Sequence, residues 1–136
     1  MDDQLPVIEF AFPGPLRDRL VNAIGLGAKT ATSSLLHEYE VGDEPLPMVG
    51  DRGAVIDSDG KRVAVIVTTA VRIVPLREVP MEHALAEGEG YESVADWRAG
   101  HTRFWTSDAM RAELGEDFEL SDSSLVVLEQ FALAPE

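Results

Sequence analysis

The sequence predicts an α+β domain built around a small, curved, mostly antiparallel β-sheet. The strongest sign is a β-branched run at residues 62–74, which follows a turn at Asp59-Gly60 and is typical of a β-hairpin. Apolar residues at helical spacing lie on both sides of that hairpin in the chain, and a last apolar stretch at 125–133 predicts a closing strand. With no internal repeat and no linker, the chain is expected to form one domain over residues 1–136.

The first part of the chain is expected to hold a short strand, a helix and a polar turn. Residues 7–12 are apolar and fit a short strand or an extended lead-in. Pro15 suits the first position of a helix, and Gly25 or Gly27 is expected to end that helix. Residues 29–34 are ambiguous: Thr30 and Thr32 favour an extended start, whereas Ser33 or Ser34 could cap a short helix through Tyr39.

The second part is expected to hold the hairpin, helices and the last strand. In residues 63–67 the apolar side chains are continuous, which predicts a strand buried on both faces or closed into a barrel. Pro80 is expected to open a short helix that stops at Gly88. Ser93 is expected to cap the next helix, with Asp96 at the third helical position.

The charge composition limits the kind of partner. The net charge is −14, which disfavours binding to long nucleic acids because such binders gain affinity by neutralising phosphates. Residues 61–77 carry four basic side chains and no acidic one, so a local basic face remains. There is no cysteine, no apolar run long enough to span a membrane, and no signal-peptide order at Met1–Gln4. We therefore expect a cytoplasmic protein with no membrane partner.

The segment 27–34 is the first candidate for a functional site, because it combines one lysine with four hydroxyl residues behind a glycine. A buried lysine beside a threonine hydroxyl could act as a general base, or it could bind an oxyanion or phosphate. Residues three apart in a regular strand face opposite sides of a sheet. Lys29 and Thr32 are therefore expected to converge only if the backbone bends at Gly27.

Two further segments carry side chains suited to a site. Glu87 and Glu89 are flanked by glycines, which predicts an exposed turn that is either solvated or faces a ligand. Trp97, His101 and Arg103 could stack a nucleobase and contact a phosphate, although their spacing also fits a buried helix face. The histidines lack zinc-site spacing and the carboxylates lack calcium-loop spacing, so no metal and no cofactor is assigned.

Short motifs follow one another along nearly the whole chain. They are Gly-x-Lys-x-x-Thr at 27–32, Val-Gly-Asp-Arg-Gly at 49–53, Glu-Gly-Glu-Gly at 87–90, an aromatic segment at 97–104 and Val-Val-x-x-x-Phe at 126–131. In this order they resemble the ASCH domain family, whose fold is related to PUA RNA-binding domains. The resemblance implies a PUA-like, small, mostly antiparallel β-barrel with flanking helices.

The resemblance also implies a set of catalytic residues. One branch of the family hydrolyses the amide of N4-acetylcytidine with a lysine and a threonine of the first motif and a later glutamate. These map onto Lys29, Thr32 and Glu87, with Glu89 as the rival glutamate. Thr32 would attack the acyl carbon, Lys29 would take its proton, and Glu87 would protonate the leaving amine. Ser34 stands where many members carry an arginine, which removes one anion-binding group.

Three functions remain open at this point. The first is hydrolysis of an acylated nucleoside, and the second is a binding module for a nucleoside, a nucleotide or short single-stranded RNA. The third is cleavage of single-stranded RNA, with Lys29 stabilising the phosphate and His101 as acid or base. The residues expected to contact the ligand are Gly27, Ser34, Arg52, Glu89, Trp97, His101 and Arg103.

Overall fold

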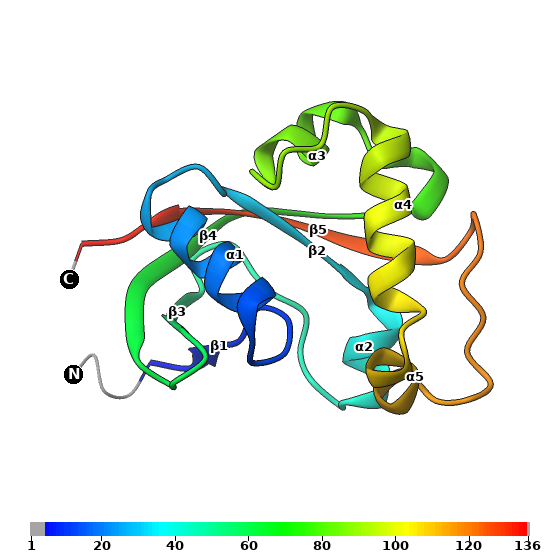
Figure 1. Cartoon of the computed structure of the whole chain (residues 1–136), viewed down its shortest axis with the longest axis horizontal. Helices are drawn as coiled ribbons and strands as arrows, with labels where there is room; N and C mark the ends of the chain where they lie inside the picture. Colours follow the sequence, from blue (N-terminus) through cyan, green and yellow to red (C-terminus); the bar gives the residue numbers. More distant parts are fainter. Residues whose placement is uncertain (1–4, 136) are drawn as a thin grey trace.

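The computed structural model describes residues 5–135 and shows a five-stranded sheet flanked by helices (Figure 1). The strands are β1 (Val7–Ile8), β2 (Ala31–Leu35), β3 (Arg52–Ile56), β4 (Arg62–Pro75) and β5 (Leu125–Leu133). They lie in the order β1-β3-β4-β5-β2, and every pair is antiparallel except β1 with β3. The predicted α+β class is confirmed. The sheet is not closed into a barrel, because β1 and β2 are its two edges and no described strand joins them.

The helices are α1 (Pro15–Gly25), α2 (Leu36–Val41), α3 (Met81–Ala86), α4 (Val94–Trp105) and α5 (Asp108–Leu114). Pro15 opens α1 as predicted. The Ser93 hydroxyl accepts the Asp96 main-chain N–H at 3.0 Å, which confirms the predicted cap of α4.

The predicted serine cap of the second helix is wrong. Ser33 and Ser34 both lie in β2, and α2 begins after them. The Glu38 carboxylate accepts the main-chain N–H of Leu35 at 2.7 Å and so satisfies one of the free donors at this helix start. Because it caps no helix, the Ser33 hydroxyl is available for contacts where β2 meets α3.

The hairpin of β3 and β4 forms as predicted. The Asp57 carboxylate accepts the main-chain N–H groups of Asp59 and Lys61, at 3.0 and 2.9 Å, which fixes the turn. Burial on both faces holds for only part of the predicted stretch, because Val65 is 1% exposed whereas Val63 is 40% exposed. The outer part of β4 therefore faces solvent on one side.

Two apolar clusters lie on opposite faces of the sheet. Alternate residues of β5 show this directly, since Val126 and Leu128 belong to one cluster and Phe131 to the other. The first cluster packs β5 and the end of β2 against α4 and α5, and it includes Trp97. The second packs α1 onto β3, β4 and β5. In Figure 1, α3 lies beside β2 and beside one end of α4.

No helix within residues 5–135 is long and apolar enough to cross a membrane. The predicted single domain included Met1–Gln4 and Glu136, and the signal-peptide argument rested on Met1–Gln4. These five residues lie outside the part of the chain that the structure describes.

Candidate functional site

The end of α3 closes against the start of β2. The main-chain N–H of Thr30 donates to the Ala86 carbonyl at 2.8 Å. Gly88 has a φ of +67°, and a Cβ there would lie 2.3 Å from the Ala28 carbonyl oxygen and 2.9 Å from the Lys29 Cα. A side chain at Gly88 is excluded by this close approach. The segment after α3 is thus pressed directly onto the Lys29 segment.

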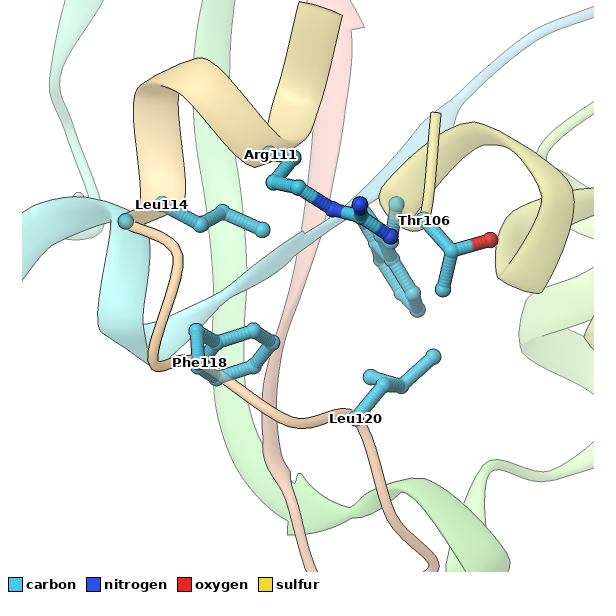
Figure 2. A pocket seen from close by; sticks show the side chains of 7 residues that line it. Thr106, Arg111, Leu114, Phe118 and Leu120 are labelled. Atoms are coloured by element: carbon cyan, nitrogen blue, oxygen red, sulfur yellow. The ribbon is translucent and has the colours of Figure 1, made fainter. Parts of the chain in front are cut away.

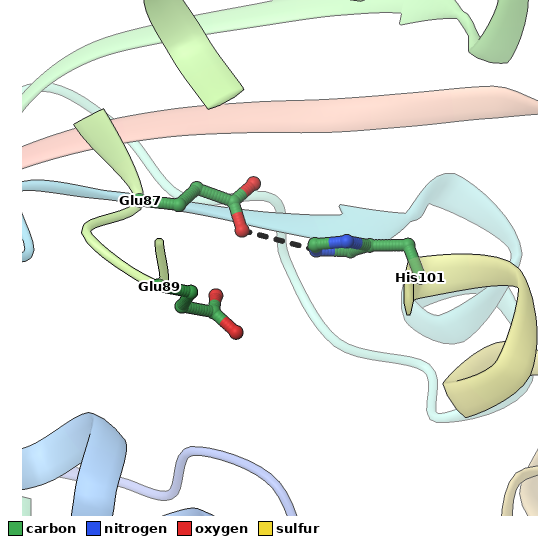
Figure 3. Close-up of side chains that lie close together, drawn as sticks. All are labelled: Glu87, Glu89 and His101. Atoms are coloured by element: carbon green, nitrogen blue, oxygen red, sulfur yellow. Dashed lines mark ion pairs between the residues drawn. The ribbon is translucent and has the colours of Figure 1, made fainter. Parts of the chain in front are cut away.

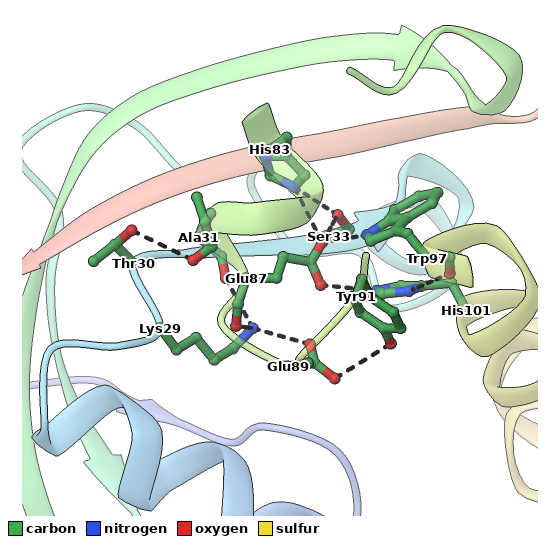
Figure 4. Close-up of polar contacts among 11 residues, drawn as sticks. Lys29, Thr30, Ala31, Ser33, His83, Glu87, Glu89, Tyr91, Trp97 and His101 are labelled. Carbon is green, nitrogen blue, oxygen red and sulfur yellow. Dashed lines mark hydrogen bonds and ion pairs between the residues drawn. The ribbon is translucent and has the colours of Figure 1, made fainter. Parts of the chain in front are cut away.

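Glu87 is the centre of a buried group of donors, which we call the Glu87 anchor (Figure 4). Its Oε2 accepts hydrogen bonds from the Ser33 hydroxyl at 2.5 Å and the Trp97 indole N–H at 2.8 Å, and lies 3.2 Å from His83 Nε2. Its Oε1 lies 3.0 Å from His101 Nε2. The residue is 1% exposed, so this carboxylate is satisfied almost entirely by protein donors.

The surroundings of Glu87 favour its ionised form. Burial on its own raises the pKa of this carboxyl, but the hydrogen bonds from His101 and His83 and the positive charges of His101 and Lys29 outweigh burial. The net result is a pKa well below the usual range of a glutamate. Glu87 is therefore a fixed anion and a poor proton donor, which argues against the general-acid role that the family resemblance implies for it.

Lys29 is held by three acceptors although it is only 2% exposed. Its Nζ donates to the main-chain carbonyls of Ala31 at 2.8 Å and Glu87 at 3.3 Å, and to the Glu89 carboxylate at 3.3 Å. Three acceptors match the three protons of an ammonium group. An ammonium group held in this way would have to give up a hydrogen bond before it could act as a base.

Glu89 is held much more loosely than Glu87. Its carboxylate contacts Lys29 Nζ at 3.3 Å and accepts the Tyr91 hydroxyl at 3.4 Å. Its side chain is 15% exposed, against 1% for Glu87. Burial raises the pKa of Glu89, the charge of Lys29 lowers it, and the neighbouring Glu87 raises it further, so the pKa lies above the usual range. Burial and the two glutamates also raise the pKa of Tyr91.

His101 faces acceptors with both ring nitrogens. Nδ1 lies 3.0 Å from the Trp97 carbonyl oxygen, and Nε2 lies 3.0 Å from the Glu87 carboxylate. A carbonyl and a carboxylate can only accept, so a ring protonated on both nitrogens would satisfy both contacts. The ring stacks on Trp97 with centroids 4.3 Å apart. The acid–base role expected for His101 in RNA cleavage would require the loss of one of these hydrogen bonds.

Glu87, Glu89 and His101 place ligand atoms within 4.8 Å of one another and form the one described group that could hold a metal ion (Figure 3). In this arrangement Glu87 Oε1 already lies 3.0 Å from His101 Nε2, and Glu89 Oε2 lies 3.3 Å from Lys29 Nζ. The three side chains are thus held by contacts within the protein, and we assign no metal to the group.

The other residues predicted for the site do not all contact the network formed by Lys29, Glu87, Glu89 and His101. Gly27 has a φ of +78°, so the backbone does bend there. Thr32, however, pairs with Glu129 in the strand register, on the face of β2 opposite to Ser33. Within residues 5–135, Thr32 has no side-chain hydrogen bond to Lys29, Glu87 or Glu89. Its expected role as nucleophile stays a prediction without a supporting contact.

Ser34, Arg52 and Arg103 make no described hydrogen bond to the network either. The Ser34 hydroxyl lies 2.8 Å from the Tyr39 hydroxyl, and Arg52 donates to the carbonyl of Pro135 at 3.4 Å. Arg103 is exposed on α4, and its charge acts on Tyr91. Among Ser34, Arg52 and Arg103, it is therefore Arg103 that lies near Tyr91 and the network.

Sequence reasoning missed three residues of the network: Ser33, His83 and Tyr91. His83 and Glu87 are four apart at the end of α3, and this helical spacing could have indicated that they meet. Ser33 could have been found from strand alternation, because a strand that begins at Ala31 places Ser33 and Leu35 on one face. Tyr91 follows Gly90 directly, and no pattern in the sequence points to its contact with Glu89.

Two hollows of the surface lie elsewhere, beside α5. The first encloses about 50 Å³ and is lined by Trp105, Thr106, Arg111, Leu114, Gly115, Phe118 and Leu120 (Figure 2). The second, wider one adjoins it along residues 114–119 and reaches His37. Neither contains a residue of the Lys29–Glu87 network, so they are separate from the candidate site.

The fold and the site together define a class: a PUA-like α+β domain with a buried lysine–glutamate network at one edge of its sheet. A family model for the ASCH domain matches residues 8–134. The chain belongs to the ASCH domain family. The family resemblance seen in the sequence is thereby confirmed.

Solved structures agree with this assignment. A protein from Enterococcus faecalis V583 is 28% identical with a TM-score of 0.83, over 95% of this chain and 76% of that one. An ASCH domain from Lactobacillus crispatus JV V101 is 30% identical with a TM-score of 0.82, over 94% of this chain and 78% of that one. An ASCH protein from Zymomonas mobilis is 11% identical with a TM-score of 0.57, over 93% and 67%, and shows a shared fold alone. Among curated proteins, no sequence matches the chain.

Proposed function

We propose that this ASCH domain binds a nucleoside, a nucleotide or a short single-stranded RNA at the network of Lys29, Glu87 and Glu89. The observation that carries the proposal is the burial of opposite charges, with Lys29 2% and Glu87 1% exposed. Removing each such ion from water costs several kcal/mol, and apolar side chains of similar size often stabilise a fold equally well. Buried charges with perturbed surroundings are characteristic of functional sites.

Aromatic and basic side chains beside the network suit a nucleobase. The rings of Tyr91 and His101 lie with their centroids 5.7 Å apart, and both residues are partly exposed. Aromatic faces stack bases in many single-strand binders, and a nearby arginine such as Arg103 strengthens such binding. The net charge of −14 favours a small ligand over a long polymer.

Calorimetric titration tests this proposal. Nucleosides, nucleoside monophosphates and short RNAs are titrated into the wild-type protein and the Lys29→Gln variant at two salt concentrations. Arg77→Gln is the matched control, because it removes the same charge from a side chain that is 53% exposed. Binding that Lys29→Gln loses and Arg77→Gln keeps supports the proposal. Absence of binding to the wild type, or equal binding to Lys29→Gln, rejects it.

Hydrolysis of an acylated nucleoside amide is the second candidate. It is favoured by the two neighbouring carboxyls, whose surroundings move their pKa values in opposite directions, as in sites where one acid donates a proton and the other stays ionised. Glu89, with its raised pKa, is then the proton donor in place of Glu87. Thr32 remains the nucleophile implied by the family resemblance. Lys29 would first pass a proton to Glu89, 3.3 Å away, so that the neutral amine takes the Thr32 hydroxyl proton and the protonated Glu89 gives its proton to the leaving amine.

This candidate is tested by incubating the protein with N4-acylated cytidines and measuring the free acid released. Glu89→Gln should abolish turnover, whereas Glu92→Gln, which removes the same charge three residues away on the surface, should not. Turnover no higher than that of a Lys29→Ala control would reject hydrolysis and leave the binding proposal standing.

A further inference from the structure

The two hydrogen-bond donors that reach the Glu89 carboxylate both lie at long distances from it. Charge-assisted N–H···O hydrogen bonds are usually about 2.7–2.9 Å long. The Lys29 and Tyr91 contacts of Glu89 measure 3.3 and 3.4 Å, so both are long. Desolvation outweighs the attraction of Lys29 for this carboxylate, which agrees with its raised pKa. The pairing of Glu89 with Lys29 is therefore a weak one for a group that is largely buried.

The two glycines that flank Glu89 differ in how closely other residues approach them. Gly88 is pressed against the main chain of Ala28 and Lys29, as described above. Gly90 has a φ of +86° and no heavy atom within 4 Å of the place where a Cβ would lie. Gly90 is exposed, and a glycine tolerates a wide range of backbone angles, so a turn about Gly90 could move Glu89 away from Lys29.

Lys29 would stay in place if Glu89 left. Its ammonium keeps the main-chain carbonyls of Ala31 and Glu87, and the Glu87 segment is fixed by the donors of the Glu87 anchor. The Lys29 ammonium would then have main-chain carbonyls as its acceptors and no carboxylate partner. A pre-organised ammonium in a site short of one negative charge is suited to an oxyanion.

We propose that the Glu89 carboxylate fills the subsite of a ligand phosphate group, and that a bound phosphate ester replaces it beside the Lys29 ammonium and the Tyr91 hydroxyl. The inference rests on the proposed nucleoside site and adds to it: the preferred ligand carries a phosphate, as a nucleotide or the end of a short RNA does. Hydrolysis needs Glu89 inside the site, whereas phosphate binding moves it out. The two uses of the site therefore exclude each other at any one moment.

The test compares ligands and variants by calorimetric titration. A nucleoside, its 5′-monophosphate and inorganic phosphate are titrated into wild type, Glu89→Gln, Glu92→Gln and the double variant Lys29→Gln/Glu89→Gln. Glu92→Gln controls for the general effect of removing one negative charge, since Glu92 is exposed. Glu89→Gln is expected to bind the monophosphate and inorganic phosphate about tenfold more tightly than Glu92→Gln does, equivalent to ~1.4 kcal/mol. The double variant is expected to lose this gain.

Each outcome bears on a separate claim. Equal phosphate affinity in Glu89→Gln and Glu92→Gln, or a gain that the double variant keeps, overturns the phosphate subsite. Binding of the nucleoside as tight as that of its monophosphate in the wild type overturns the subsite and leaves the proposed function intact. If no nucleoside binds any variant, the proposed function fails, while inorganic phosphate still tests the subsite. Should Glu89→Gln fail to fold, the wild-type ratio of monophosphate to nucleoside affinity decides.

Discussion

Glu87 and Glu89 are two residues apart, yet the surroundings of their carboxyl groups shift the two pKa values in opposite directions. Glu87 is surrounded by the hydroxyl of Ser33, the indole of Trp97 and two histidine rings, and its pKa is lowered. Glu89 has two long contacts, and its pKa is raised. The difference shows that burial alone does not decide the state of a carboxyl group; the number of donors around it does.

The separation of roles follows from the elements that meet at each residue. Glu87 ends α3 at the place where β2 and α4 converge, so donors reach it from three elements. Glu89 lies on the glycine-flanked segment beyond, where only Lys29 and Tyr91 reach it. The Glu87 carboxylate is therefore held in one position by its donors, whereas the Glu89 carboxylate, with two long contacts, can move.

The largest predicted effect is that of Glu87→Gln. Removing one partner of a buried charged group leaves the others unpaired, which typically costs about 3–5 kcal/mol. The free energy of unfolding, measured by chemical denaturation at neutral pH, should fall by that amount. Because the folded pKa lies below the unfolded one, the stabilisation by Glu87 is fully present above the unfolded pKa and is lost as the pH falls through the folded pKa. A loss below 1 kcal/mol would contradict the role of Glu87 as an anchor.

The two glycines that flank Glu89 give the second comparison. Gly88→Ala should lower the free energy of unfolding by about 2–4 kcal/mol, because it combines an unfavourable backbone conformation with a clash against main-chain atoms. Gly90→Ala adds a methyl group in open space and should cost only about 1–2 kcal/mol from its positive φ. Thermal and urea unfolding of the two variants measure this difference. Equal losses would show that the packed and open halves of the segment are not distinct.

Ser33 and Thr32 form a third pair, adjacent in β2 but on opposite faces. Ser33→Ala removes a hydrogen bond to a buried charged group and should destabilise the fold by about 1.5–3 kcal/mol. Thr32→Val keeps the shape of the side chain and removes a hydroxyl without a described partner, so the free energy of unfolding should change by less than about 0.5 kcal/mol. If Thr32→Val abolishes hydrolysis and Ser33→Ala does not, the nucleophile implied by the family resemblance is supported despite the absence of a hydrogen bond.

Most of the fold could be predicted from the sequence, because its signals are local. The Asp-Gly turn at Asp59-Gly60, the Pro15 helix start and the Ser93 cap each depend on residues a few positions apart. Whether the sheet closes could not be predicted, since closure depends on the pairing of strands distant in sequence. The open edges at β1 and β2 are a property of the whole sheet.

The site could be predicted less well, because it depends on which face each side chain occupies. A motif places Lys29 and Thr32 three residues apart but does not fix where the strand begins. The strand begins at Ala31, which brings Ser33 to Glu87 and turns Thr32 to the other face. Contacts such as that of Trp97 with Glu87 depend on how α4 packs against α3. Local pattern carries no information about that packing.

Glu89→Gln is predicted to change stability with a sign opposite to that of Glu87→Gln. Because the folded pKa of Glu89 lies above its unfolded value, the folded state favours the protonated carboxyl, and ionisation at higher pH opposes folding. Any stabilisation from this group is therefore present below the unfolded pKa, about 4.3 for a glutamate, and is lost as the pH rises through the folded pKa. The neutral Gln avoids that loss.

Unfolding of wild type and Glu89→Gln, measured by urea denaturation at several pH values, tests this sign. Relative to wild type, Glu89→Gln should become progressively more stable as the pH rises from the acid range to neutrality. Glu92→Gln should show no such trend, since it removes the same charge from an exposed position. If Glu89→Gln instead loses stability toward neutral pH, the pairing with Lys29 is a firm structural ion pair. Glu89 would then belong with Glu87 in the fixed part of the site, and no phosphate could displace it.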